Sequence, residues 1–301
     1  MHLIKRIFLF LAINILILFT ISFLLTLFNI KPFLTAYGVD YYALLIFCFL
    51  WGFTGAFISL FLSRKMAIWL MGVKLINPQT QDAMEKYLIE TVARFAKEEG
   101  LSPSIQVGIY QSDEINAFAT GPTKNRSLIA ISSALLSKMD RNEIKAIIGH
   151  EMSHISNGDM VTMTLLQGIV NAFVMFLARA LAFLIMSGGR SKNSRSKSFM
   201  YYPLVFLFEI VFMLLGSLIV SAFSRRREYR ADFGGAKLAG KQNMIAALTS
   251  LKSNQSIVDK TKQQPAFQNF KISSTPSKKL IYLFASHPPI DDRINRLKQL
   301  G

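Results

Sequence analysis

The five residues His150-Glu151-Met152-Ser153-His154 have the spacing H-E-x-x-H. On an α-helix, side chains four residues apart lie on one face, so His150 and His154 can bind the same metal ion. Glu151 follows the first histidine and can accept a proton from a metal-activated water that attacks a peptide carbonyl. The motif therefore predicts a zinc-dependent hydrolase with one Zn²⁺ per chain.

The residues around the motif predict that it lies on a helix. Asp140 and Glu143 have the spacing of a capping box, and Asn157-Gly158-Asp159 is a plausible helix end. The alternative is a helix that carries two histidines by chance. The chain contains only four histidines and two of them lie in this pentapeptide, which argues against chance.

The apolar residues of this 301-residue chain are clustered in blocks, unlike those of a soluble protein. A helix needs about 20 apolar residues to cross a bilayer, and each block is long enough. No small-x-small cleavage site follows the first block, so we interpret it as a retained signal anchor rather than a secretory signal. The sequence predicts four membrane segments, at Ile7–Ile30, Tyr41–Ser63, Met160–Gly189 and Ser198–Ser224.

The formal net charge of +16 is explained by basic residues that flank the apolar blocks, such as Arg64 and Arg225. No aromatic residues alternate with them, so we expect a lipid bilayer and no nucleic acid as partner. The positive-inside rule places the N-terminus and the region after Ser63 in the cytosol. The basic loop between the third and fourth blocks disagrees, so these blocks either span or enter the membrane without crossing it.

Two charged residues lie within the apolar blocks, Arg179 in the third and Glu209 in the fourth. Charges in lipid are costly and face protein or water. One interpretation is that the two pair across the hairpin. The other is that each separately faces a cavity or extends to the interface.

Periodicity in the polar regions predicts an α+β fold, a mostly helical integral membrane protein with a small β-sheet. Strands are expected at Ser104–Tyr110, Ile115–Thr120 and Leu128–Ser132, with helices at Gln79–Gly100 and Ile290–Leu300. The polar stretch Lys252–Lys279 is interpreted as a mobile insertion. The predicted parts are a transmembrane hairpin (1–63), a first cytosolic part (64–159), a second membrane hairpin (160–224) and a second cytosolic part (225–301).

A catalytic zinc site needs a third protein ligand, and Glu228 is a candidate. Glu228 and Asp232 are spaced to lie one helical turn apart on one face. The nearer carboxylate could bind the metal while the other accepts a hydrogen bond from a ligating histidine. Such acid pairs are common on solvated helices, so this spacing carries weight only beside H-E-x-x-H.

The chain resembles the HtpX family of membrane zinc metalloproteases, which is related to the CAAX prenyl proteases. The resemblance covers nearly the whole chain and implies a gluzincin-type protease domain in the cell inner membrane, with the active site facing the cytoplasm. It also implies cleavage of misfolded or damaged membrane proteins under stress. The motifs that carry it are His150–His154, Glu228-Tyr229-Arg230-Ala231-Asp232, Asn116-Ala117-Phe118-Ala119-Thr120-Gly121 and Ser286-His287-Pro288-Pro289.

By matching motifs, the resemblance implies that His150, His154 and Glu228 bind zinc and that Glu151 is the base. Asp232 would be the carboxylate behind a ligand. His287 would stabilise the oxyanion or hold the substrate, although a turn histidine before two prolines is an equally simple explanation. The segment that would lie along the bound peptide consists of Asn116, Ala117, Phe118 and Ala119.

Two other functions are compatible with parts of the sequence. Prenyl-protein processing would keep the fold, but the four apolar blocks resemble the HtpX branch more closely. A non-enzymatic transporter or binding protein would make Arg179 and Glu209 the functional pair. The intact Glu151 argues against it, because a structural zinc site needs no base. The sequence does not indicate an oligomeric state.

Overall fold

A computed structural model describes residues 34–35, 38–188, 194–261 and 282–299, which form two compact units. The helical unit consists of Met1–Leu60 and Thr162–Val220, and the sheet unit of Phe61–Val161 and Ser221–Gly301. The predicted span Ile7–Ile30 lies outside the described residues, as does most of the predicted insertion after Thr261.

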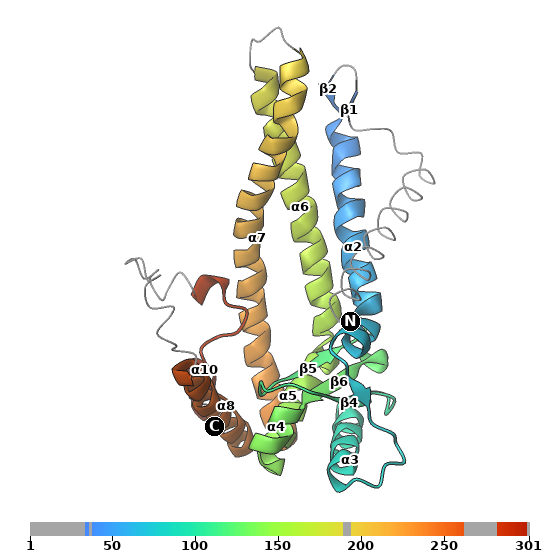
Figure 1. Cartoon of the computed structure of the whole chain (residues 1–301), viewed down its shortest axis with the longest axis vertical. Coiled ribbons are helices and arrows are strands. Elements are labelled where there is room, and N and C mark those ends of the chain that lie inside the picture. The colour runs from blue at the N-terminus through green and yellow to red at the C-terminus, as the bar shows by residue number, and fades with distance from the viewer. Residues whose placement is uncertain (1–33, 36–37, 189–193, 262–281, 300–301) are drawn as a thin grey trace. The chain divides into compact units, whose positions relative to one another are not determined.

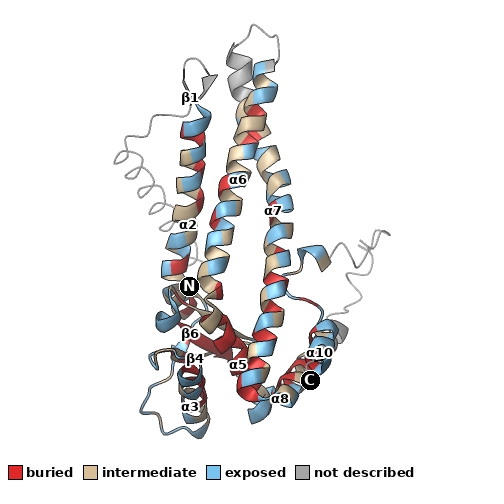
Figure 2. Cartoon of the chain, turned by 180° about the vertical axis from the view of Figure 1, so that it is seen from behind, coloured by how far each residue is buried: buried red, intermediate tan, exposed pale blue. Residues whose placement is uncertain are grey.

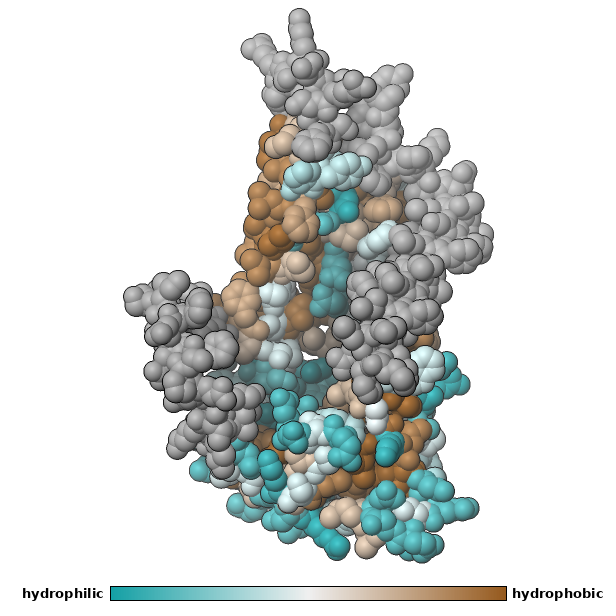
Figure 3. Space-filling model, in the orientation of Figure 1, coloured by the Kyte–Doolittle hydropathy of each residue, from teal (hydrophilic) through white to brown (hydrophobic). Residues whose placement is uncertain are grey.

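Three helices of the described chain are long and apolar enough to cross a membrane (Figure 1). They are α2 (Tyr41–Leu70), α6 (Asp159–Gly188) and α7 (Ser194–Ala239). Their most apolar windows have mean hydropathies of 2.2, 2.2 and 2.5. Figure 3 shows mostly apolar surface along the upper part of the molecule where α7 runs. Phe206, Met213 and Ile219 of α7 are exposed. Three of the four predicted membrane segments are thus confirmed as apolar helices.

Small residues bring the helices of the helical unit close together. A Cβ at Gly52 of α2 would lie only 2.7 Å from the carbonyl oxygen of Gly168 in α6. Ala178 and Ala182 of α6 are fully buried against Val205 of α7. Contacts of this kind favour helix association in a membrane, where the hydrophobic effect between helices is absent. The segment before α2 is a two-stranded hairpin of β1 (Leu34–Thr35) and β2 (Gly38–Val39).

Arg179 and Glu209 form an ion pair between α6 and α7, with 2.7 Å between Nη1 and Oε1. The same guanidinium nitrogen donates to the carbonyl oxygen of Met175 at 3.1 Å. Their side chains are only 20% and 30% exposed. The interpretation that these residues pair is therefore confirmed.

Reversing one of these charges leaves two like charges facing each other among apolar side chains. We expect Arg179→Glu and Glu209→Arg each to lower the amount of folded protein in the membrane, and the double reversal to restore much of it. Quantitative immunoblotting of membrane fractions measures this. Equal loss in the double variant would show that the pair does not stabilise the helical unit.

The sheet unit contains a four-stranded mixed sheet in the order β3-β4-β6-β5. Strands β4 and β6 are parallel, and the two outer pairings are antiparallel. The three predicted strands are confirmed, with β4 and β5 each beginning two residues later than expected, and β3 was not predicted. Their bounds are β3 (Lys74–Leu75), β4 (Gln106–Tyr110), β5 (Ala117–Thr120) and β6 (Leu128–Ser132).

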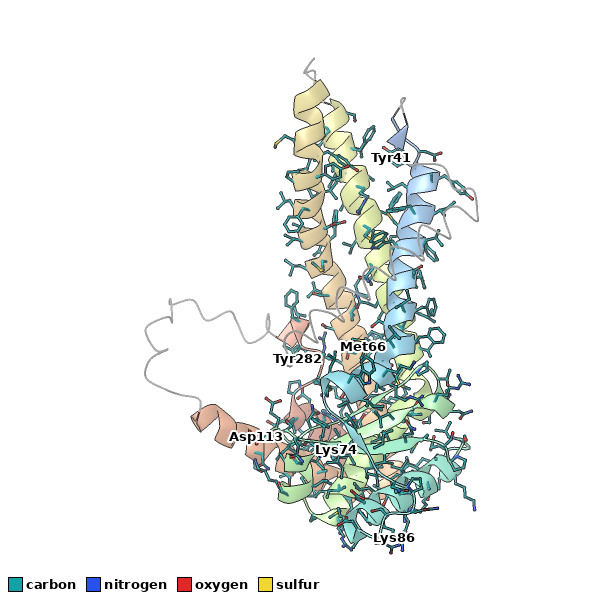
Figure 4. All side chains as sticks on the ribbon, turned by 45° about the vertical axis from the view of Figure 1, so that its right-hand side comes forward. Tyr41, Met66, Lys74, Lys86, Asp113 and Tyr282 are labelled. Carbon is teal, nitrogen blue, oxygen red and sulfur yellow. The ribbon has the colours of Figure 1, made fainter. Side chains whose placement is uncertain are left out.

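Helices pack on this sheet around a core that includes Leu88, Phe95, Ile131, Ile148 and Leu248. Figure 2 shows that α5 is buried along most of its length. In Figure 4 the labelled Lys74 marks β3 and the labelled Lys86 marks α3. A short 3-10 turn precedes β6. The helices are α3 (Ala83–Glu98), α4 (Ser133–Lys138), α5 (Arg141–Asn157), α8 (Lys241–Thr261) and α10 (Ile290–Gln299), and the turn is η1 (Lys124–Arg126).

Helix α8 corrects one expectation, because it continues into the stretch that was interpreted as a mobile insertion at Lys252–Lys279. Residues 252–261 are helical. No glycine or proline occurs between Lys241 and Thr261, and Pro265 is the first helix breaker. The polar composition of this segment therefore did not prevent a helix.

Two glycines allow the backbones of α5 and α7 to approach each other closely. A Cβ at Gly235 would lie 2.9 Å from the backbone nitrogen of His150, and a Cβ at Gly149 would lie 3.2 Å from the carbonyl oxygen of Gly235. A Cβ added at the neighbouring Gly234 would lie 2.6 Å from the Cβ of Ser153. Any side chain at this crossing would push apart the two helices that carry the candidate site.

We expect Gly235→Ala to destabilise the sheet unit by about 1–3 kcal/mol, because the added methyl group overlaps backbone atoms that cannot rotate away. Thermal unfolding of the purified protein in detergent measures the loss. Lys237→Ala, on the exposed face of the same helix, is the control, since the Lys237 side chain is 71% exposed. Equal unfolding temperatures for the two variants would contradict the close packing.

Candidate metal centre

Local interactions fix the ends of α5, the helix that carries H-E-x-x-H. The Asp140 carboxylate accepts hydrogen bonds from the backbone nitrogens of Asn142 and Glu143, both at 2.8 Å. Glu143 returns a bond by accepting from the Asp140 nitrogen at 3.0 Å, and Gly158 ends the helix with a φ of 69°. The predicted capping box and helix end are confirmed.

The structure brings His150 and His154 of α5 together with Glu228 of α7. Nε2 of His150 lies 3.6 Å from Oε2 of Glu228, and Nε2 of His154 lies 3.3 Å from Oε1. The two imidazole rings are nearly perpendicular, with centroids 4.7 Å apart. One donor atom from each of the three buried residues lies within 4.8 Å of the others.

This donor set fits a zinc ion in both chemistry and spacing. Ligands about 2.0–2.2 Å from a tetrahedral zinc are separated from one another by roughly 3.4 Å. The two nitrogen-to-oxygen distances of 3.6 and 3.3 Å agree with that separation. Two imidazoles and one carboxylate are also a common protein ligand set for catalytic zinc.

In each histidine, Nε2 faces Glu228 and Nδ1 lies next to another carboxylate. Nδ1 of His154 lies 2.6 Å from Oδ2 of Asp159, and Nδ1 of His150 lies 3.0 Å from Oδ1 of Asp232. The His154 contact is a well-formed hydrogen bond, whereas Nδ1 of His150 is not aligned to donate one. Carboxylates in this position orient imidazole ligands and increase their basicity.

The sequence did not identify Asp159 as part of the site, because it was interpreted only as a helix end. Asp159 begins α6, directly after the sharp turn at Gly158, and is only 2% exposed. The available signal was an acidic residue directly after the helix that carries the second histidine. Asp232, which the sequence did single out, lies 3.0 Å from Nδ1 of His150.

Arg293 of α10 was also missed and balances the charge of Asp232. It is buried and donates two hydrogen bonds to the Asp232 carboxylate, at 2.7 and 2.6 Å. The sequence held a signal, because Arg293 lies at helical spacing with Ile290 and Leu297 on the apolar face of α10. Arg227, 3.4 Å from Glu228, is a second missed cation.

The carboxylates determine the protonation of the two imidazoles when no metal is bound. Burial lowers the pKa of His150, but the Asp232 and Glu228 carboxylates raise it by more, to about 9. Burial likewise lowers the pKa of His154, while Asp159 and Glu228 hold it above its ordinary value. A metal ion must therefore displace protons from this site, and its affinity falls on acidification.

A cavity of about 540 Å³ opens onto His150, Glu151 and Glu228. Glu151, 8% exposed, reaches the cavity from the residue after His150. His287 also lines the cavity, and its Nδ1 lies 2.8 Å from Oε2 of Glu228. The other lining residues are Ile115, Asn116, Ala117, Leu135, Ile147, Leu251, Tyr282, Ala285, Pro288, Pro289, Ile290 and Arg293.

The predicted peptide-binding segment lies partly at this cavity, on an edge strand of the sheet. Asn116 and Ala117 line the cavity, whereas Phe118 turns to the other face and packs near Tyr110, with ring centroids 5.6 Å apart. Strand β5 pairs only with β6 among the described strands. The backbone nitrogen of Ser132 in β6 donates a hydrogen bond to the carbonyl oxygen of Asn116. In an antiparallel pair every second residue bonds to the partner strand, so the backbone groups of Ala117 and Ala119 point to the free edge of β5.

The sequence and fold are similar to those of known proteins. The model of peptidase family M48 matches residues 82–300. The chain is 46% identical to a protein named protease HtpX homolog from Bacillus subtilis strain 168 over 301 residues, covering 98% of this chain and 99% of that protein. It is 50% identical to protease HtpX of Idiomarina loihiensis over 300 residues, with the same coverage.

A crystal structure of S. mikatae Ste24p has a similar fold, with a TM-score of 0.64. The match covers 98% of this chain and 64% of that chain. The two sequences are 19% identical, so the similarity shows the fold alone. The chain spans about two thirds of the length of that structure.

Asp159→Asn should weaken zinc binding roughly 10- to 100-fold, because the amide removes the charge that holds His154 in position. Competition with a chromophoric chelator in detergent measures the affinity. Asp113→Asn, at an exposed loop acid, is the control. Unchanged zinc affinity in Asp159→Asn would mean that His154 is positioned by other contacts.

Proposed function

The chain belongs to peptidase family M48, its full-length relatives are HtpX proteases, and we propose that it is a zinc-dependent endopeptidase whose active site faces the cytoplasm. The observation that supports this most strongly is the convergence of His150, His154 and Glu228 beside a cavity that Glu151 also lines. A structural zinc site would need neither a cavity nor a neighbouring base.

In this proposal the two Nε2 atoms and the Glu228 carboxylate hold one zinc ion. The ion supplies Lewis-acid chemistry and lowers the pKa of a water in the cavity. The Glu151 carboxylate accepts a proton from the attacking water and delivers it to the leaving nitrogen of the peptide. Asp159 orients the His154 imidazole by a hydrogen bond. Asp232 places a negative charge 3.0 Å from Nδ1 of His150, and Arg293 neutralises the Asp232 carboxylate.

We propose that the substrate binds as an extended chain along the edge of β5. The outward backbone groups of Ala117 and Ala119 can form ladder hydrogen bonds with it, while Asn116 contributes its side chain to the cavity wall. His287, held to Glu228 through Nδ1, can present Nε2 to the cavity. In its protonated form it would donate to the developing oxyanion.

The proposed substrates are misfolded or damaged membrane proteins of the cell inner membrane, cleaved under stress. An unfolded chain can adopt the extended conformation that an edge strand requires, whereas a folded domain cannot without local opening. The predicted cytosolic parts, 64–159 and 225–301, contain every residue to which the proposal assigns a role. The three apolar helices favour a bilayer as the setting.

The test is zinc-dependent cleavage of an unfolded protein by enzyme purified with a chelator and then reloaded. We expect Glu151→Gln to bind zinc as the wild type does and to lose about 10²- to 10⁴-fold in rate, because only the base is lost. Mass spectrometry of the products also detects self-cleavage during purification.

Glu228→Gln should bind less zinc and cleave correspondingly less, because the amide is a poorer ligand than a carboxylate. Glu114→Gln is the matched control, because Glu114 is an exposed acid next to Ile115, which lines the cavity. Full activity in Glu151→Gln would exclude that residue as the base. Zinc binding without any cleavage by the wild type would contradict the proposed function.

A further inference from the structure

Four polar residues on one face of α7 each contact the C-terminal segment 282–293. Their spacings of four, three and four residues place them in one line along the helix. All four are buried, with exposures of 9% or less. We call this set of contacts the polar ladder: Ser221 with Phe284, Arg225 with Tyr282, Leu283 and Ala285, Glu228 with His287, and Asp232 with Arg293.

Arg225 makes the most contacts in the ladder. Its Nη1 donates to the carbonyl oxygens of Tyr282, Leu283 and Ala285, at 3.2, 2.9 and 2.9 Å. Its guanidinium also lies 4.8 Å from the ring centroid of Tyr282, which Figure 4 labels. The carbonyls of Tyr282 and Leu283 lie in a short helical turn at 282–284, and that of Ala285 follows it. The Tyr282 carbonyl also accepts a hydrogen bond from the Ala285 nitrogen at 3.2 Å. A buried cation is suited to this place, because the carbonyl end of a turn carries partial negative charge.

The segment held in this way forms one wall of the cavity. Within 282–290, six residues line the cavity, namely Tyr282, Ala285, His287, Pro288, Pro289 and Ile290. Arg225 and Ser221 themselves do not line it. Pro288 and Pro289 restrict the backbone, so a displacement at Ala285 moves the following residues with it.

We propose that Arg225 is a positioning residue for substrate binding, which holds segment 282–290 in place as a wall of the cavity that Asn116 and Ala117 also line. The inference rests on the proposed peptidase function. The two lower contacts of the ladder, at Glu228 and Asp232, belong to the candidate metal centre. The contacts at Ser221 and Arg225 can be removed without removing a zinc donor. We therefore expect their loss to weaken peptide binding while zinc affinity stays close to that of the wild type.

The test compares Arg225→Met with the wild type in full-length, zinc-loaded protein in detergent. Methionine keeps an unbranched side chain but donates no hydrogen bond. We expect amide exchange in 283–290 to become roughly 10- to 100-fold faster, because bonds to a charged donor are lost locally. We expect KM for an unfolded protein to rise about tenfold, with kcat and zinc content within about twofold of the wild type.

Two milder variants keep the result interpretable if Arg225→Met folds poorly. Ser221→Ala removes one hydrogen bond and should produce a smaller change of the same kind. Arg225→Lys should recover part of the wild-type KM, because all three bonds come from one nitrogen and an ammonium group also has three donors. Arg226→Met, at an exposed neighbour, is the matched control and should change neither exchange nor KM.

Unchanged exchange in 283–290 would overturn the inference, and so would faster exchange with an unchanged KM. A loss of kcat and zinc in parallel with KM would show that Arg225 supports the metal centre rather than the wall. If the wild type binds zinc but cleaves nothing, the proposed function fails and the substrate-binding role of Arg225 fails with it. The exchange data then still decide whether Arg225 holds the segment.

Discussion

The candidate metal centre depends on the close crossing of α5 and α7 at Gly149 and Gly235. The backbone of one helix lies against the backbone of the other, so Nε2 of His150 lies only 3.6 Å from Oε2 of Glu228. Larger residues at the crossing would increase the separation of the helix axes. The separation of the donors is therefore determined by backbone contact and not by flexible side chains, which is how a rigid ligand set is obtained.

The buried acids around the two imidazoles are only partly offset by cationic side chains of the sheet unit. Glu228, Asp232 and Asp159 are nearly inaccessible to water, and a buried carboxylate without a partner would be strongly unfavourable. Arg293 and Arg227 lie close to these acids and offset part of their charge. A divalent cation would offset the rest, which explains why so many acidic groups can be buried in one place. In the helical unit, Arg179 and Glu209 satisfy each other, so their presence requires no transport function.

The features that the sequence predicted correctly arise from local or strongly periodic patterns. The capping box at Asp140, the end of α5 at Gly158 and the strands β4 and β6 are of this kind. The three metal-binding candidates were named from H-E-x-x-H and from the resemblance of Glu228-Tyr229-Arg230-Ala231-Asp232 to the HtpX motif, because the spacing of Glu228 and Asp232 alone is common on solvated helices. The roles of Asp159 and Arg293 were missed, since each depends on a partner that only the tertiary fold brings near. The close approach at Gly235 and the polar ladder were missed for the same reason, and β3 is too short to have a period.

The order of these residues along the chain has a consequence for the timing of biosynthesis. The H-E-x-x-H helix is synthesised first, the third donor follows only after α6 and most of α7, and Arg293 and the cavity wall come later still. Chains are synthesised at about 5–20 residues per second, and their N-terminal parts begin to fold first. Under the proposed function, a nascent chain that ends before α7 has His150, His154 and Glu151 but lacks the third donor. Such a precursor would be unable to hydrolyse its own unfolded segments, and the cavity would be complete only after segment 282–290 had packed against α7.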